Sequence, residues 1–262
     1  MQTTLSSDLA RRIRRQCGEN VFLCYQCGKC SSGCPVAEHF DLLPNELLRA
    51  IQLGREDAAL KSRTLWLCAM CETCAVRCPH GINITKIMDV LKIMAQHEGL
   101  PSPLPAAVLF NQAALRGIRV FGKMYEAGLM GEVYLRQMAA GTLDYRQLIK
   151  RDLPLALKMI RKRKLKLLPS FGRLRVPEKT AGRKEGTAYY PGCSLHGTAG
   201  EYDSSARAAL FALGVKLEEP KGWNCCGSTP AHSTDHYLSV SLPLRNMLAL
   251  ERAGFSNITT PC

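Results

Sequence analysis

Apolar residues recur at helical spacing in two stretches of the first hundred residues. The first stretch ends at Gly54, a typical helix stop, and comprises Leu43, Leu47, Leu48 and Ile51. The second stretch comprises Ile84, Ile87, Met88, Leu91 and Met94. Between them, the pattern predicts one further helix from Arg55 to Leu67. Because residues 1–100 show no alternation of apolar and polar positions, we expect this part of the chain to be all-α.

The last part of the chain has a different pattern, in which short β-prone segments alternate with helical ones. Strands are expected at 188–190, 215–217 and 258–260, and helices are expected at 201–213 and 237–253. An order of strand, helix, strand, helix, strand predicts parallel pairing with right-handed crossovers. The expected fold of this part is therefore α/β.

Residues 101–185 connect these two parts. They begin with three prolines, continue as moderately apolar helical segments and end in a basic tract broken by proline and glycine. We therefore expect an all-α domain over 1–100, a helical connector and basic linker over 101–185, and an incomplete α/β domain over 186–262. The fold class is α + α/β.

The net charge of +13 is concentrated in one segment. Between Arg146 and Lys184 there are 14 Lys and Arg against two acidic residues, so the rest of the chain is nearly neutral. This distribution argues against a general nucleic-acid surface. A basic amphipathic stretch over 153–167 is compatible with a solvated linker, with docking to an acidic subunit or with peripheral binding to a membrane. A signal peptide and an 18-residue apolar run are both missing from the sequence, so we expect a cytoplasmic protein with at most peripheral membrane association.

Eight of the 13 cysteines form an internal repeat. The first copy runs Cys24-Tyr-Gln-Cys27-Gly-Lys-Cys30-Ser-Ser-Gly-Cys34-Pro, and the second runs Cys68-Ala-Met-Cys71-Glu-Thr-Cys74-Ala-Val-Arg-Cys78-Pro. This is the C-x2-C-x2-C-x3-C-P spacing of bacterial ferredoxins that bind [4Fe–4S] clusters. Zinc sites pair two C-x2-C knuckles and give no reason to repeat all four positions and the proline.

The fourth cysteine of such a run ligates the other cluster in two-cluster proteins. The sequence therefore predicts two cubane [4Fe–4S] clusters with crossed ligation. The ligands of the first cluster are Cys24, Cys27, Cys30 and Cys78, and those of the second cluster are Cys68, Cys71, Cys74 and Cys34.

A third group of cysteines follows the expected strands of the last part: Cys193, then Cys225-Cys226-Gly227, then Cys262. Open α/β sheets gather their sites at the carboxyl ends of strands. Buried or redox-labile thiols are the alternative interpretation of this group. His196, His232 and His236 follow these cysteines and are candidate proton donors, but the sequence assigns no catalytic residue.

These cysteine runs resemble those of a known family. The run Leu23-Cys24-Tyr-Gln-Cys27-Gly, with Leu67-Cys68 and Cys78-Pro79, is similar to the C subunit of heterodisulfide reductase. The spacing C-x31-C-C-G-x35-C is similar to the first part of the CCG cysteine-rich domain of its B subunit. The resemblance covers about residues 15–100 and 186–262. It implies that Cys193, Cys225, Cys226 and Cys262 are ligands of a noncubane [4Fe–4S] cluster.

The resemblance implies an oxidoreductase subunit that relays electrons through two cubane clusters toward a thiol/disulfide site in CCG domains. Its expected partners are flavin-containing or other iron–sulfur subunits, because the sequence has no nucleotide- or flavin-binding motif. The thiol/disulfide substrate would be met in the complete complex. Two alternatives are the iron–sulfur subunit of a glycolate, lactate or glycerol-3-phosphate dehydrogenase that feeds quinone, and a free ferredoxin-like carrier.

The CCG pattern is incomplete as the sequence stands. A further cysteine is expected three positions after Cys262, and a second CCG repeat is expected after that. We therefore expect that this chain alone does not reduce a disulfide.

Overall fold

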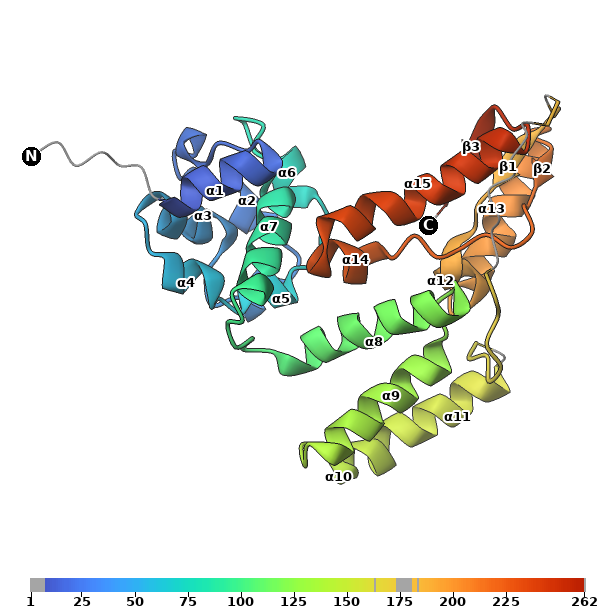
Figure 1. Cartoon of the computed structure of the whole chain (residues 1–262), viewed down its shortest axis with the longest axis horizontal. Helices are drawn as coiled ribbons and strands as arrows, with labels where there is room; N and C mark the ends of the chain where they lie inside the picture. The colour runs from blue at the N-terminus through green and yellow to red at the C-terminus, as the bar shows by residue number, and fades with distance from the viewer. Residues whose placement is uncertain (1–7, 163, 173–180, 183, 262) are drawn as a thin grey trace, which may run out of the picture. The chain divides into compact units, whose positions relative to one another are not determined.

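The computed structural model describes residues 8–162, 164–172, 181–182 and 184–261. Its elements divide into two compact units, Met1–Val108 with His232–Asp235, and Leu109–Ala231 with His236–Cys262 (Figure 1). The fold is mixed α/β, since helices dominate and a small parallel sheet lies in the second unit.

The first unit is built from short helices around one long helix. Within residues 8–104 of this unit no strand is present. Two 3-10 turns, Val21–Leu23 and Ala37–His39, accompany the helices. The helices are α1 (Asp8–Cys17), α2 (Lys29–Ser32), α3 (Pro44–Gln52), α4 (Glu56–Leu60), α5 (Thr64–Leu67), α6 (Thr73–Val76) and α7 (Ile84–His97).

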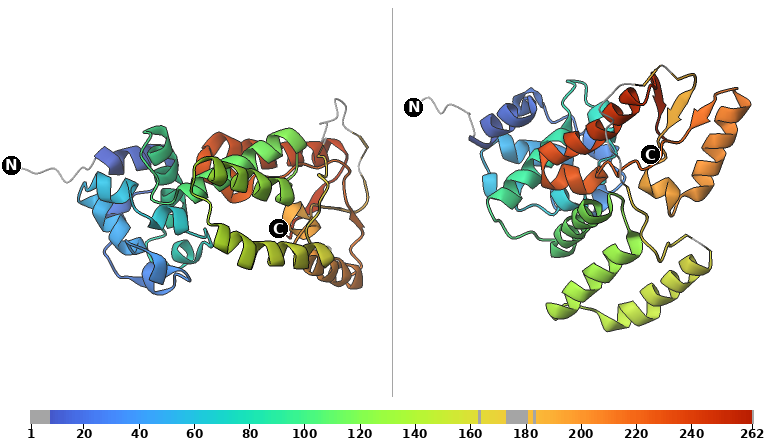
Figure 2. Two further views of the ribbon diagram at one scale, coloured as in Figure 1. Left: turned by 90° about the horizontal axis from the view of Figure 1, so that it is seen from below. Right: turned by 45° about the vertical axis from the view of Figure 1, so that its right-hand side comes forward.

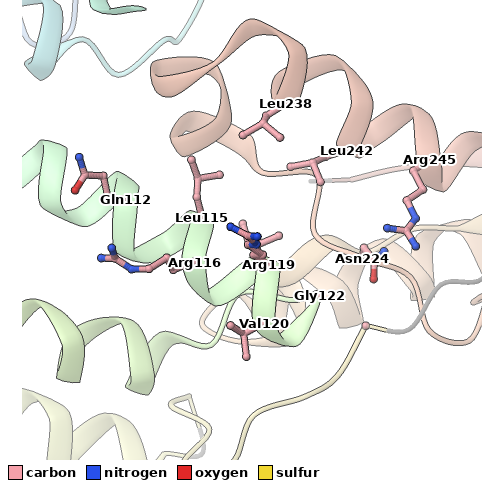
Figure 3. Close-up of a pocket in the computed structure, with 12 residues that line it drawn as sticks. Gln112, Leu115, Arg116, Arg119, Val120, Gly122, Asn224, Leu238, Leu242 and Arg245 are labelled. Atoms are coloured by element: carbon pink, nitrogen blue, oxygen red, sulfur yellow. The ribbon is translucent and has the colours of Figure 1, made fainter. Parts of the chain in front are cut away.

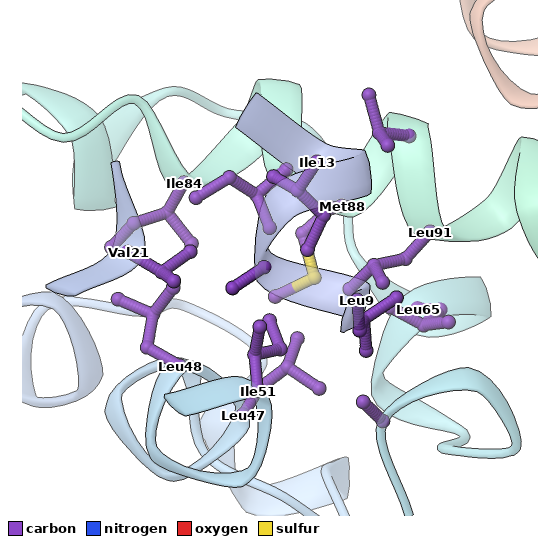
Figure 4. Close-up of a cluster of buried hydrophobic side chains, with 14 of the residues drawn as sticks. Leu9, Ile13, Val21, Leu47, Leu48, Ile51, Leu65, Ile84, Met88 and Leu91 are labelled. Atoms are coloured by element: carbon purple, nitrogen blue, oxygen red, sulfur yellow. The ribbon is translucent and has the colours of Figure 1, made fainter. Parts of the chain in front are cut away.

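The apolar stripes predicted from the sequence form the core of this unit. Leu47 and Ile51 of α3 belong to the same buried cluster as Ile87 and Leu91 of α7, and all four side chains are at most 1% exposed. Figure 4 shows this cluster. Helix α7 begins where the Asn83 side chain accepts the Lys86 N–H. The helical spacing of the sequence is therefore confirmed by the packing.

The prediction of one helix from Arg55 to Leu67 is wrong. The structure has two short helices there, α4 and α5, because the carboxylate of Asp41 takes the backbone N–H groups of Arg63 and Thr64 at 2.8 and 3.0 Å. The same carboxylate accepts the Ser62 hydroxyl at 2.7 Å. Asp41, about 20 positions earlier in the sequence, thus caps the start of α5, so that α4 and α5 do not form one helix.

The two cysteine loops have matching backbone conformations. Gln26 and Met70 occupy equivalent positions and have φ of 65° and 53°, and the next pair, Gly28 and Glu72, has φ of 74° and 59°. Each loop then enters a four-residue helix, α2 or α6. The sequence repeat is thus a repeat of backbone geometry, including a left-handed residue that is glycine in one copy and glutamate in the other.

The second unit contains the helices of the connector and the α/β part. The connector has α8 (Pro105–Phe121), α9 (Glu126–Ala139), α10 (Tyr145–Gln147), a π-helical turn (Leu148–Asp152) and α11 (Leu153–Arg161). The α/β part has β1 (Thr187–Tyr189), α12 (Gly192–His196), α13 (Gly200–Ala212), β2 (Leu217–Glu218), α14 (Ser228–Thr234), α15 (His236–Arg252) and β3 (Asn257–Thr259).

The three strands form a sheet in the order β2-β1-β3. Both strand pairs are parallel, as the alternating pattern predicts. Ala188 of the central strand pairs with Glu218 on one side and Ile258 on the other. Tyr189 is fully buried, and its hydroxyl donates to Asp203 at 2.6 Å. The sheet thereby presents the segment after β1, which carries Cys193, at its carboxyl edge.

The cap on α5 gives a test of stability. We expect Asp41→Asn to lower the free energy of unfolding of the first unit by about 1 kcal/mol, as for other N-cap losses. Burial alone would raise the pKa of Asp41, but the hydrogen bonds from Ser62, Arg63 and Thr64 outweigh it and hold the pKa below its ordinary value. The contribution is therefore complete above the unfolded pKa of about 3.9 and is lost as the pH falls through the folded pKa.

Anaerobic urea titrations followed by circular dichroism at pH 6 and 8 should give the same difference between wild type and Asp41→Asn. That difference should shrink below about pH 4. Asp57→Asn is the matched control, because Asp57 is 86% exposed and pairs with the exposed Lys61. It should change stability by less than about 0.5 kcal/mol. Equal effects of the two substitutions would contradict the capping role of Asp41.

The left-handed position in the loops gives a second test. A Cβ added at Gly28 would meet nothing within 4 Å, so the cost of Gly28→Ala comes from backbone strain alone. We expect a loss of about 1 kcal/mol in urea titrations. Glu72→Gly at the matching position removes the same backbone strain, but glycine also makes the unfolded chain more flexible. Because these two effects oppose each other, the free energy of unfolding of this variant should be within about 0.5 kcal/mol of the wild-type value. A neutral Gly28→Ala would show that φ at this position is not constrained.

Candidate iron–sulfur and cysteine-rich sites

Four cysteines from the two sequence repeats line one small pocket in the first unit. Three come from the first loop and one from the end of the second: Cys24, Cys27, Cys30 and Cys78. The rest of the lining includes Gly28, Asn45, Leu48 and Ile84, so the pocket has an apolar floor. These four cysteines are the ones that the sequence assigns to the first cluster.

Other contacts also join the two repeats. The ring of Tyr25 in the first loop meets the ring of His80 edge-on, with centroids 5.0 Å apart. The side chain of Arg77 lies over Gly33, so that a Cβ at position 33 would overlap the guanidinium group. Helices α2 and α6 pack against each other. Gly33 and Arg77 are equivalent positions of the repeat, and the missing side chain in one copy leaves room for the long one in the other.

The cysteines assigned to the second cluster are also close to one another. The thiols of Cys68 and Cys71 both act electrostatically on Cys74. Cys34, from the first repeat, acts on Cys68, although burial is the main cause of the raised pKa of Cys68. Cys78 thus lines the pocket of the first three cysteines of the first repeat, and Cys34 acts on Cys68 of the second repeat.

In each of the two loops, one thiol has a lowered pKa and another has a raised pKa. The pKa of Cys27 is lowered chiefly by the N–H of Lys29, and the pKa of Cys71 is lowered chiefly by the hydroxyl of Thr73. Burial raises the pKa of Cys30, and it raises the pKa of Cys74 to about 12. Each loop therefore offers an exposed thiol that ionises readily and a buried one that ionises when a metal replaces its proton.

The cysteine donors fit a cluster better than a single metal ion. Among the described residues, no three His, Cys, Asp or Glu side chains converge on a point that one metal ion could occupy. A zinc ion needs its sulfur ligands at about 2.3 Å from one centre. A cuboidal cluster spreads its four thiolates over four irons, so four cysteines that line one pocket without converging on a point suit a [4Fe–4S] group.

In the second unit, Cys193 and Cys225 form a pair of thiols. The Cys225 thiol donates a hydrogen bond to Cys193, which lowers the pKa of Cys193 and raises that of Cys225 to about 12. The backbone N–H of Met124 donates to Cys193 Sγ at 3.4 Å. Cys193 is therefore the thiol of the pair that is prepared to be a thiolate.

The adjacent cysteines lie in a stretch without regular secondary structure before α14. Cys225 is buried, whereas Cys226 is half-buried, and Gly227 follows with φ of 86°. A hydrogen bond to Cys225 and burial both raise the pKa of Cys226. The structure thus brings together three of the four cysteines that the resemblance implies. The fourth, Cys262, lies outside the described residues.

A set of side chains that cysteine spacing does not reveal surrounds Cys193. The Lys123 ammonium lies 3.6 Å from the centre of the Trp223 ring, and Trp223 donates its indole N–H to Glu219 at 3.1 Å. His196 Nε2 is 2.9 Å from the same carboxylate. Burial lowers the pKa of both Lys123 and His196. Cys193, His196, Lys123 and Trp223 line one pocket.

The connector contributes directly to this site. The carbonyl of Gly122 accepts the N–H of Cys225 at 2.8 Å. Residues 123–126, with Lys166, Leu168 and Ser170, supply part of the pocket wall. Sequence reasoning places these residues in a connector and linker. No cysteine or glycine motif marks them, and the signal that could have found them is the dipeptide Gly122-Lys123 within the helical segments of the connector. Of the candidate histidines, His196 lines the pocket, whereas His232 lies in α14 and His236 begins α15.

A larger cavity of about 740 Å³ lies between α8 and α15 (Figure 3). Arginine side chains and an amide form its polar wall, and leucines form its apolar wall: Arg116, Arg119, Arg245, Asn224, Leu115, Leu238 and Leu242. Asn224 precedes Cys225, and its Oδ1 is buried without a hydrogen-bond partner in the described part of the chain. The lining suits an anionic molecule with an apolar body.

Comparison with known proteins identifies both cysteine-rich regions. Residues 20–82 match the model of a 4Fe-4S dicluster domain, and residues 187–262 match the model of a cysteine-rich domain, the CCG family. These ranges contain the duplicated cysteine run and the third cysteine group, respectively.

Curated relatives match the first part of the chain. The iron–sulfur C subunit of the CoB–CoM heterodisulfide reductase of Methanopyrus kandleri is 36% identical over 80 residues, which are 30% of this chain and 42% of that protein. The C subunit of the ferredoxin/F420H2-dependent CoB–CoM heterodisulfide reductase of Methanosarcina acetivorans is 35% identical over 99 residues, 38% of this chain and 60% of that protein.

A protein of Archaeoglobus profundus that is described as like the C subunit of heterodisulfide reductase is 30% identical over 129 residues, 48% of this chain and 62% of that protein. The chain thus spans less than two thirds of the length of these relatives. It is an iron–sulfur protein similar to the C subunits of heterodisulfide reductases, in which a CCG cysteine-rich domain follows the 4Fe-4S dicluster domain.

Proposed function

We propose that this chain is the iron–sulfur electron-transfer subunit of a heterodisulfide reductase-like complex. Its two cubane [4Fe–4S] clusters would pass electrons toward a thiol/disulfide site in CCG domains. The observation that carries this proposal is the pocket in which Cys78 of the second repeat joins Cys24, Cys27 and Cys30 of the first. The relatives among heterodisulfide reductase C subunits support the same function, and they do not favour a quinone-linked dehydrogenase subunit.

The ligands of the first cluster would be Cys24, Cys27, Cys30 and Cys78, and those of the second cluster would be Cys68, Cys71, Cys74 and Cys34. A bound cubane supplies a one-electron carrier. The chain's own contribution is to keep the buried ligands of the two clusters close together, since Cys30 acts electrostatically on Cys74 and α2 packs on α6. Electron exchange between the clusters would follow from this proximity.

In the complete protein, the second unit would take part in holding a noncubane [4Fe–4S] cluster through Cys193, Cys225, Cys226 and Cys262. The hydrogen bonds from Met124 and Cys225 to Cys193 support this, because ligand cysteines bind as thiolates. His196, held by Glu219, lines the same pocket and could deliver a proton to a thiolate product. Electrons would come from a flavin-containing or another iron–sulfur subunit, and the disulfide would be met in the complete complex, not by this chain alone.

The first experiment counts the clusters. We expect roughly eight irons and eight acid-labile sulfides per chain from the two four-thiolate sites of the first unit, in anaerobically prepared protein. Electron paramagnetic resonance after dithionite reduction should show two interacting reduced clusters. Stoichiometric zinc, with no resonance after reduction, would overturn the proposal.

The second experiment tests the crossed ligation with pairs of substitutions. Cys34→Ser with Cys74→Ser removes two ligands of one cluster, so about half of the iron should remain. Cys34→Ser with Cys30→Ser removes a ligand from each cluster, and little iron should remain. Cys17→Ser is the control and should keep full iron content, because Cys17 lies outside the motif and donates to the Ile13 carbonyl. If the iron contents of the two double variants were reversed, ligation would be within each repeat.

A further inference from the structure

The hairpin of α9 and α11 in the second unit has a large apolar outer surface. The two helices lie side by side in two different views (Figures 1 and 2), and the Tyr134 hydroxyl of α9 donates to Asp152 at 3.0 Å. The buried residues of α9, Leu129 and Val133, cluster with Ala113 and Ala114 of α8, whereas no residue of α11 is buried. An apolar surface of this kind marks an interaction site.

Four large apolar side chains form a row along the second arm of this hairpin. Tyr145, Ile149, Leu153 and Leu157 follow one another at intervals of four residues, through α10, the π-helical turn and α11. They are 57%, 62%, 51% and 60% exposed. Side chains four residues apart lie on one helix face, so these four form a continuous stripe, which we call the apolar row.

A second row lies directly beside the first. One position further along, at the same interval, the chain has Arg146, Lys150, Lys158 and Lys162, with Pro154 between them. All four cationic side chains are exposed, and none of them forms an ion pair within the part of the chain that the structure describes. We call them the basic row. Asp152 is the single acidic residue between Tyr145 and Gly172, so this segment carries a large excess of positive charge.

We propose that the two rows bind the surface of a bilayer that contains anionic lipids. Tyr, Ile and Leu would enter the boundary between headgroups and acyl chains, and the adjacent Lys and Arg would pair with lipid phosphates. Within the described residues no helix is long and apolar enough to cross a membrane, and surface binding does not require one.

The composition of the basic row favours a lipid surface over an acidic protein. Three of its four cations are lysines, and Lys164 and Lys166 follow in the sequence. Lysine is depleted in protein–protein interfaces, whose polar contacts favour arginine. At a bilayer, the aliphatic stem of lysine covers apolar surface while its ammonium group remains among the headgroups. The apolar row beside a lysine row therefore fits the lipid interface better.

The test is sedimentation of the complete chain with vesicles, which measures binding without any redox readout. The wild-type chain should sediment with vesicles of phosphatidylcholine containing about one third phosphatidylglycerol, and not with phosphatidylcholine alone. Lys150→Gln with Lys158→Gln should weaken binding about 30-fold, the factor that corresponds to about 1 kcal/mol for each lysine. Leu153→Ser with Leu157→Ser should also weaken it, while iron content and the circular dichroism spectrum stay unchanged.

Lys216→Gln with Lys221→Gln is the matched control, since it removes the same charge from two exposed lysines outside the rows. It should leave vesicle binding unchanged. An equal loss in both double-lysine variants would reduce the effect to net charge and overturn the proposal. Absence of wild-type sedimentation with the anionic vesicles would also overturn it, and would direct attention to an acidic protein partner. Because iron analysis tests the clusters separately, failure of this proposal would leave the electron-transfer function untouched.

Discussion

The approach of the two cysteine loops to each other is the contact on which the first unit depends. Each loop is short, and its helix, α2 or α6, has only four residues, so neither could bury an apolar face alone. Cys30 and Cys74 are nevertheless buried, because the loops pack together and α3 and α7 cover them. A metal centre with ligands from both loops would add a covalent link to a contact that packing already makes.

The same constraint explains the matched details of the repeat. The second cysteine of each loop is exposed and accepts hydrogen bonds at the start of a helical turn, whereas the third is buried. Gly33 and Arg77, which are equivalent in sequence, differ because only one side chain fits where the loops meet. Equivalent positions of the two repeats thus have the same backbone conformation, and their second and third cysteines have the same directions of thiol pKa shift. Their side chains differ where the two loops are in contact.

In the second unit, the cysteine-rich site depends on a segment that precedes it by many residues. Gly122 and Met124 supply a backbone acceptor to Cys225 and a backbone donor to Cys193, and Lys123 lies against Trp223. The connector is therefore part of the wall of this site, while its outer arm carries the apolar and basic rows. The connector thus has two roles. Its loop at 122–125, between α8 and α9, forms part of the cysteine-rich site, whereas α10, the π-helical turn and α11 carry the apolar row and the basic row.

The sequence by itself determined the helix stripes of α3 and α7, the three parallel strands and the eight motif cysteines, since each follows from local periodicity or spacing. It did not separate α4 from α5, because the cap comes from Asp41, which lies far away in sequence. It also did not reveal Lys123, Met124 or the exposure of the apolar row. Those features depend on which surfaces meet in three dimensions. Periodicity indicates that a side chain is apolar, and only tertiary packing decides whether another part of the chain covers it.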